Sequence, residues 1–213
     1  MEATHWPLYG LRLRTPRLEL RLPRLAELDA LAQLAAEGVH DPSWTPFLVP
    51  WTDLPPAERA RSVMQHHWRT LAEWTPQDWT LELAVFRGGD PVGIQGVSGR
   101  DFAIVGEVSS GSWLGLRHHG QGIGTEMRAA ILDLAFTGLG AESAASGALA
   151  GNDASAGVSR KLGYQPNGLT RRRVRDAWGW EQRFALDRGR WEQHRTVPVE
   201  IAGLGPCLAQ FGR

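Results

Sequence analysis

The stretch that decides the fold runs from His118 to Glu126 and reads HHGQGIGTE. It lies between an apolar, strand-like run, SWLGL at 112–116, and a helical run at 127–136. The glycines at 120, 122 and 124 let the backbone approach a ligand without interference from Cβ atoms. The first N–H groups of the following helix have no intrahelical acceptor, and the positive end of the helix dipole lies behind them. A strand, a glycine turn and a helix N-terminus in this order predict a cradle for an anion such as pyrophosphate.

Other interpretations of the loop compete with this one. A dinucleotide-binding fold requires Gly-x-Gly-x-x-Gly and an acidic residue about twenty positions later, but here the third glycine falls one position early and the acidic residue is missing. A Walker A loop requires Gly-Lys-Ser/Thr, and no lysine lies near. A tight strand-to-helix connection that binds no ligand is the remaining alternative. The loop alone does not decide between the anion cradle and this connection.

A second motif follows at 151–164 and reads GNDASAGVSRKLGY. Asn152 is a typical N-cap, Gly163 is a typical helix end, and Tyr164 follows directly. The segment therefore predicts a short capped helix closed by a glycine and an aromatic residue. The two motifs at this spacing are far more specific than either one alone.

Together the two motifs resemble the GCN5-related N-acetyltransferase (GNAT) superfamily. Its Gln/Arg-x-x-Gly-x-Gly/Ala loop aligns with HGQGIG at 119–124, and its Asn-x-x-Ser-x-x-Val-x-x-Lys-Leu-Gly-Phe/Tyr segment aligns with 152–164. The phrase LRLRTPRLELRL at 11–22 is typical of the branch that resembles RimJ and RimL, the ribosomal-protein N-terminal acetyltransferases. The resemblance covers about residues 11–195. Within that branch the sequence is similar to actinobacterial proteins, some of them described as succinyl-CoA transferases.

Length, charge and cysteine content restrict the protein class. A chain of 213 residues suits one α/β domain. Lys+Arg and Asp+Glu both total 23, so no net charge recruits nucleic acid or an acidic membrane. Cys207 is the only cysteine, which excludes an intramolecular disulfide and a cysteine-based metal cluster. No run approaches the ~18 apolar residues of a membrane span, and no signal peptide is visible. We expect a cytoplasmic protein without a metal, a membrane anchor or a direct nucleic-acid partner.

The hydrophobic periodicity predicts an alternation of strands and helices. Strands are expected at 11–22, 79–87, 92–98, 106–116, 142–149, 169–174 and 182–186, and helices at 25–38, 55–74, 124–139 and from Asn152. This order predicts an α/β fold with a mixed sheet of six to seven strands and helices on both faces. The resemblance implies that strands four and five splay apart to admit the acyl-CoA thioester. Residues 1–195 are expected to form a single GNAT domain, and 196–213 an extension that packs on it or on a second subunit.

The resemblance implies an acyl-CoA-dependent N-acyltransferase in which a primary amine attacks the thioester directly. Acetyl-CoA is the donor expected for the superfamily, and succinyl-CoA is the alternative. The amine belongs to a protein N-terminus or to a small molecule, as in aminoglycoside-type acylases. A homodimer or higher homo-oligomer is expected. The alternative from another class is a module that binds acyl-CoA with weak or lost catalysis, because serines replace a common tyrosine and glutamate.

Donor binding is assigned to the two motifs. The resemblance and the loop geometry imply that backbone N–H groups hold the pyrophosphate; this loop comprises Gly120, Gln121, Gly122, Ile123, Gly124 and Thr125. His119 stands where the family usually has Gln or Arg, and its imidazole can still donate a hydrogen bond. The resemblance implies that a backbone N–H near Trp113 or Leu114 polarises the thioester carbonyl, while core packing is the alternative role for the Trp113 side chain. Asn152 is implied to bind the pantetheine arm, in addition to capping its helix.

The proton-transfer groups are less certain from sequence. Ser155 is the predicted proton donor to the departing thiolate, by analogy with the RimJ-like branch. Ser159 stands where many members carry tyrosine and is the second candidate. RimJ-like sequences often have Glu where this chain has Ser109; Glu107 lies on the same strand face and is the candidate base, with a solvated strand end as its alternative. An aromatic loop with Trp44, Phe47 and Trp51 is expected to line the acceptor pocket or to pack against a subunit.

Overall fold

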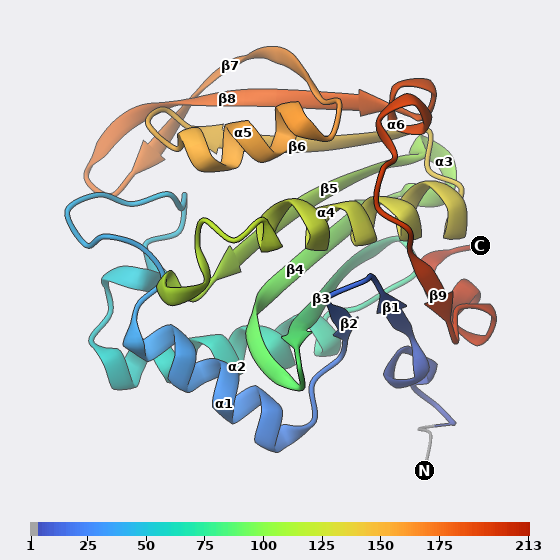
Figure 1. Cartoon of the computed structure of the whole chain (residues 1–213), viewed down its shortest axis with the longest axis horizontal. Coiled ribbons are helices and arrows are strands. Elements are labelled where there is room, and N and C mark those ends of the chain that lie inside the picture. Colours follow the sequence, from blue (N-terminus) through green and yellow to red (C-terminus); the bar gives the residue numbers. More distant parts are fainter. Residues whose placement is uncertain (1–3) are drawn as a thin grey trace.

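The computed structural model describes residues 4–213 (Figure 1). A single sheet of nine strands runs through it in the order β7-β8-β6-β5-β4-β3-β2-β1-β9. The strands are β1 Arg12–Arg14, β2 Glu19–Arg21, β3 Asp78–Arg87, β4 Asp90–Arg100, β5 Glu107–Leu114, β6 Ser143–Leu149, β7 Gln165–Val174, β8 Ala177–Asp187 and β9 Glu200–Ala202. The helices are α1 Leu25–Glu37, α2 Pro56–Ala72, α3 Phe102–Val105, α4 Ile123–Asp133, α5 Asp153–Lys161 and α6 Arg188–His194. The predicted α/β class with a mixed sheet is confirmed, with nine strands where six to seven were expected.

The N-terminal strand differs from its prediction. The stretch 11–22 forms two short antiparallel strands, β1 and β2, instead of one. Thr15 closes the turn between them, because its backbone N–H donates to the Leu18 carbonyl at 3.0 Å. Pro16 follows and has no N–H to continue a ladder. The remaining additional strand, β9, comes from the C-terminal segment and pairs with β1.

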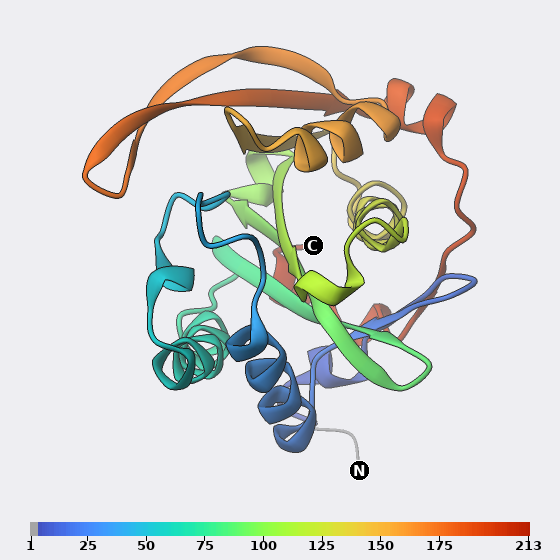
Figure 2. The same cartoon turned by 60° about the vertical axis from the view of Figure 1, so that its left-hand side comes forward.

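Helices cover both faces of the sheet, and each face has its own apolar core. Helices α1 and α2 lie on one side of the central strands and α4 on the other (Figure 2). The core between α1, α2 and the sheet includes Leu31, Ala84 and Ile94. The core on the other face is larger and contains Leu83 and Ile131. Alternate residues of β3 and β4 thus enter opposite cores, as the two-residue strand period requires.

The sheet opens between β5 and β6. These are the neighbouring strands that run parallel, and they pair only over Glu107–Ser143, Val108–Ala144 and Ser109–Ala145. Beyond this point β5 remains paired with β4 and β6 with β8, so each strand is held while the two diverge toward the N-terminus of α4 (Figure 1). On β5, the N–H groups that face β6 from Ser110 onward therefore lack a ladder partner. This is the splay that the family resemblance implied.

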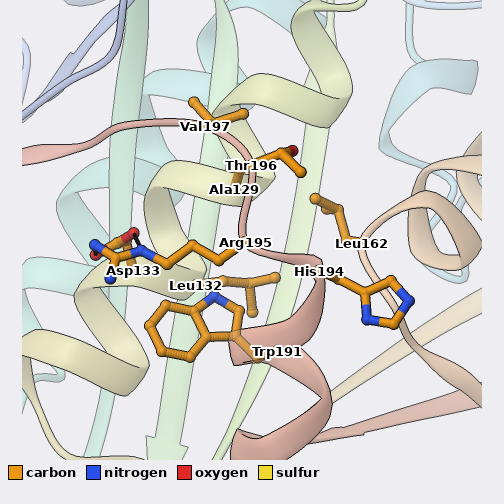
Figure 3. A pocket seen from close by; sticks show the side chains of 9 residues that line it. All are labelled: Ala129, Leu132, Asp133, Leu162, Trp191, His194, Arg195, Thr196 and Val197. Atoms are coloured by element: carbon orange, nitrogen blue, oxygen red, sulfur yellow. Dashed lines mark hydrogen bonds and ion pairs between the residues drawn. The ribbon is translucent and has the colours of Figure 1, made fainter.

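The C-terminal segment packs on the same domain. Cys207 and Phe211 are fully buried, and the Phe211 ring centroid lies 4.9 Å from that of Trp79. On its way there the chain crosses α4, where Arg195 bonds the buried Asp133 at 2.8 Å and lies over Trp191 (Figure 3). The space left under this crossing is about 10 Å³, room for about one water molecule and not for a substrate. Between residues 4 and 213, no helix has the length and apolar character needed to span a membrane.

Candidate active site

The glycine loop joins the open end of β5 to α4. Gly120 and Gly122 have φ angles of +73° and +77°, a left-handed conformation that other L-residues rarely adopt. No atom lies within 4 Å of the position that a Cβ would occupy on Gly120, so the loop surface is open there. Gly122 is the N-cap of α4. The glycines are therefore needed for the turn itself and leave its outer surface accessible.

This loop presents a row of backbone donors. Within residues 4–213, none of the N–H groups from 120 to 125 donates to a backbone acceptor, and the first intrahelical bond is that from the Glu126 N–H to the Gly122 carbonyl. Unpaired N–H groups at and before a helix N-terminus are suited to bind an anion. The structure thus places the predicted residues 120–125 together in one turn, next to the point where β5 and β6 separate.

Arginines from distant segments surround the loop. The Arg17 guanidinium donates to the Gln121 carbonyl at 3.1 Å and pairs with the carboxylate of Glu126, and Arg87 donates to the Gln121 side chain at 2.6 Å. Glu126 lies in the first turn of α4 and is nearly buried, so its charge would repel an anion if Arg17 did not compensate it. Sequence reasoning missed this pair. The Thr15-Pro16-Arg17 turn is its only local signal, because the partners are far apart in the chain.

His119 has a structural contact in this loop. Its Nε2 lies 3.1 Å from the Leu114 carbonyl, which makes that nitrogen the donor and fixes the loop against the end of β5. The Leu114 side chain packs inward, close to Gly124. The predicted contact of His119 with pyrophosphate stays a prediction. Only the other ring nitrogen, Nδ1, can make this contact without breaking the bond from Nε2 to Leu114.

On the side of the sheet that faces α1 and α2, aromatic rings and glycines line the opening. Trp113 packs against Trp51, with 5.7 Å between the ring centroids. This row of rings continues through Phe47 to His40 in the loop between α1 and α2. Core packing is therefore the role that the structure shows for the Trp113 side chain. Gly111, two residues earlier on the same face, has nothing within 4 Å of a potential Cβ. An acceptor can approach the separated strands from this side of the sheet, which faces α1 and α2 and is called the acceptor face below.

The far wall of this face comes from the hairpin formed by β7 and β8. Its tip reaches the loop between α1 and α2, as both views show, and Arg175 binds Asp53 through two bonds of 2.7 Å (Figure 2). The Arg175 guanidinium lowers the pKa of Asp53. Arg175, at the end of the segment RRRVR at 171–175, thus contributes a contact that spans the acceptor face.

The comparisons with known proteins agree with this geometry. Residues 17–165 match the acetyltransferase (GNAT) domain family. The chain belongs to the GNAT acetyltransferase family. RimJ from Mycobacterium smegmatis, solved in complex with CoA-disulfide, has a similar fold with a TM-score of 0.71 at 20% identity, over 95% of each chain.

Two other solved acetyltransferase structures have a similar fold. RimL, a ribosomal L7/L12 alpha-N-protein acetyltransferase in complex with coenzyme A, has a TM-score of 0.65 at 17% identity, over 81% of this chain and 95% of that one. A GNAT-family acetyltransferase from Bacillus anthracis has a TM-score of 0.63 at 14% identity, over 83% and 98%. At these identities the likeness shows a shared fold.

In this GNAT protein the second motif borders the opening. The Asn152 side chain caps α5 by accepting from the Ser155 N–H at 3.1 Å, which confirms its capping role. Its amide nitrogen remains able to donate to a ligand. Ser155 is partly exposed in the first turn. Ser159 is fully buried, and its hydroxyl donates to the Ser155 carbonyl at 3.2 Å. Of the two serines, Ser155 is thus the one a ligand can reach.

Two carboxylates on the acceptor face are candidates for the base. Glu107 is exposed and accepts a 3.0 Å bond from Ser143, at the closed end of the opening. Glu82 on β3, which sequence reasoning missed, lies over Gly96, with a carboxylate oxygen 2.6 Å from that residue's potential Cβ. Gly96 pairs directly with Gly111. The Glu82 carboxylate, over β4, is therefore one strand spacing of about 5 Å from Gly111 in the open part of β5. Glu107 lies four residues, about 13 Å, from Gly111 along β5 itself.

The Glu82 carboxylate has a titratable neighbour. His66 on α2 approaches it with 3.8 Å between Nε2 and Oε1. The interaction with Glu82 raises the pKa of His66. A carboxylate and an imidazole at this spacing can together accept and release a proton near neutral pH.

Proposed function

We propose that this protein transfers an acyl group from acetyl-CoA or succinyl-CoA to the primary amine of a protein N-terminus or a small molecule. The amine attacks the thioester directly. The observation that carries the proposal is the row of N–H groups from 120 to 125, placed beside the separated strands β5 and β6. The row suits a diphosphate, and the opening suits a pantetheine arm that reaches the acceptor face. Membership of the GNAT family supports the acyl-CoA donor.

The chain supplies candidates for each step of the transfer. Backbone N–H groups on the unpaired edge of β5 polarise the thioester carbonyl. Asn152 orients the pantetheine arm, and Ser155 delivers a proton to the thiolate as it leaves. Glu82 takes the proton from the amine with His66 beside it, and Glu107 is the alternative base. The position of Glu82 over the glycine pair Gly96 and Gly111 supports this order of preference.

The acceptor face supports an amine that arrives as an ammonium ion. Glu82 flanks it on β3 and Glu181 on β8, where Arg172 pairs with Glu181 at 2.8 Å, and both carboxylate side chains are less than one-fifth exposed. An extended N-terminus can lie between the aromatic row that ends at Trp113 and the hairpin held by Arg175. RimL, by its description, acetylates the α-amine of a ribosomal protein. A protein N-terminus is accordingly the first acceptor to test.

Donor binding is tested first, with a matched pair of variants. Gly122→Glu places a side chain and a negative charge in the cradle, whereas Gly140→Glu imposes the same strain at a φ of +73°, in open space at the far end of α4. We expect Gly122→Glu to abolish CoA binding in calorimetry and Gly140→Glu to leave it unchanged. Unchanged affinity in Gly122→Glu would refute the assignment.

Turnover is then measured across peptides with different N-terminal residues and a panel of small amines. We expect thiol release that depends on the acceptor and saturates with it. Ser155→Ala should lower turnover more than CoA affinity. CoA binding without turnover on any amine would favour a binding module over an enzyme.

A further inference from the structure

A buried cation lies behind the separated strands. Arg128 on α4 is only 4% exposed, and no Asp or Glu between residues 4 and 213 forms an ion pair with it. Its hydrogen bonds go to three neutral hydroxyls: Ser159 at 3.0 Å, Ser146 at 3.4 Å and Ser112 at 3.5 Å. A guanidinium stays protonated in proteins, so this position carries a charge that bonds to neutral hydroxyls compensate poorly.

Other buried polar atoms around Arg128 also lack partners. The Arg128 Nε atom has no hydrogen-bond partner within the described residues, and neither does the Gln95 side-chain oxygen. The Tyr164 hydroxyl has only the Ser110 hydroxyl beside it. Gln95 on β4 pairs in register with Ser112, one of the residues that Arg128 contacts. Burial raises the pKa of Tyr164, and the nearby charge of Arg128 opposes that shift. Buried polar groups are normally paired, so a group of unpaired ones around a cation points to a polar ligand that completes them.

The location of Arg128 ties it to the opening. Its guanidinium contacts Ser112 on β5 and Ser146 on β6, the two strands that separate, and Ser146 directly follows the last paired residue, Ala145. Ser159 on α5 completes the contact from the second motif. If the donor occupies the opening as proposed above, a chain that extends from its acyl group toward the α4 side of the sheet meets Arg128 between the two strands.

We propose that Arg128 binds a carboxylate at the end of the donor's acyl chain, so that the preferred donor is the CoA thioester of a short dicarboxylic acid. This inference rests on the proposed function, because it assumes an acyl-CoA in the opening. A carboxylate supplies the missing negative charge and matches the fork of guanidinium donors with two parallel bonds. The Tyr164 hydroxyl is an additional donor for the carboxylate. An acetyl group leaves all of these groups unpaired.

The test compares two donors with the same number of acyl carbons, one charged and one not. Calorimetry on the wild-type protein should show succinyl-CoA binding about ten-fold or more tightly than butyryl-CoA, as expected for a bond between charged groups. Arg128→Met should remove this difference and leave the affinity for CoA itself unchanged, while Arg128→Lys should keep part of it. Equal affinity for the two thioesters in the wild type would overturn the inference, whether or not a variant folds.

The variants separate a binding role from a structural one. Removing an unpaired buried charge should leave the Tm of ligand-free Arg128→Met equal to or above that of the wild type. A lower Tm with all thioesters weakened alike would show that Arg128 only holds the strands together. Equal losses of turnover with acetyl-CoA and succinyl-CoA would assign it to the departing thiolate instead. If CoA alone does not bind the wild type, the proposed function fails; if CoA binds without preference between the thioesters, only this inference fails.

Discussion

Glu82 and Glu107 are the two candidates for the base that takes the proton from the amine, the first indicated by the structure and the second by the sequence. The nearness of Glu82 to the open part of β5 leads us to expect that Glu82→Gln lowers kcat about 100-fold. Glu107→Gln is the matched control on the same face and should have a small effect. The reverse pattern would assign the base to Glu107.

His67 on α2 should make the fold sensitive to acid. The side chain is 2% exposed, and burial lowers its pKa from 6.5 to about 4. Between these two values the unfolded chain binds a proton at His67 and the folded chain does not, so stability falls as the pH drops from about 6.5 to about 4. The linkage amounts to at most about 3 kcal/mol.

The measurement is urea unfolding of the wild type and His67→Leu at pH 7 and pH 4.5. The variant should lose less stability on acidification than the wild type. An identical loss in both proteins would show that His67 does not titrate as its burial implies.

Among the elements, strand β5 should accept a new side chain at the opening without loss of stability but with loss of turnover. Gly111→Val adds a β-branched residue to β5 where no atom lies within 4 Å, so the Tm should stay the same or rise. The new side chain covers the acceptor face, so kcat/KM for the amine should fall while CoA affinity persists. Ser109→Val, where β5 still pairs with β6, is the control and should have a weaker effect. Normal turnover in Gly111→Val would place the acceptor elsewhere.

The elements were largely predictable from sequence because their signals are local. Asn152 caps α5 as predicted, and α1 ends before Gly38, since both positions have strong intrinsic preferences. The first strand was predicted wrongly because its apolar alternation continues through the turn at Thr15 and Pro16. The groups that complete the site come from pairings across the fold, such as Arg17 with Glu126 or Glu82 over Gly96, and no local pattern encodes these pairings.

At the scale of the whole molecule, the C-terminal segment should contribute substantially to stability. Phe211 is fully buried, with its ring against Trp74 and Trp79, so it joins the last residues of the chain to the main core. Phe211→Ala should lower the free energy of unfolding by about 3–5 kcal/mol, as measured by urea denaturation. The partly buried Leu208 gives a comparison in the same segment, and its truncation should cost less. A loss below about 1 kcal/mol would indicate that the segment packs only loosely.

The most direct test of the assignment is a crystal structure of the protein with coenzyme A. We expect the diphosphate oxygens to lie roughly 3 Å from N–H groups between residues 121 and 125, with the pantetheine arm between β5 and β6. A complex in which the diphosphate binds away from this loop would contradict the assignment.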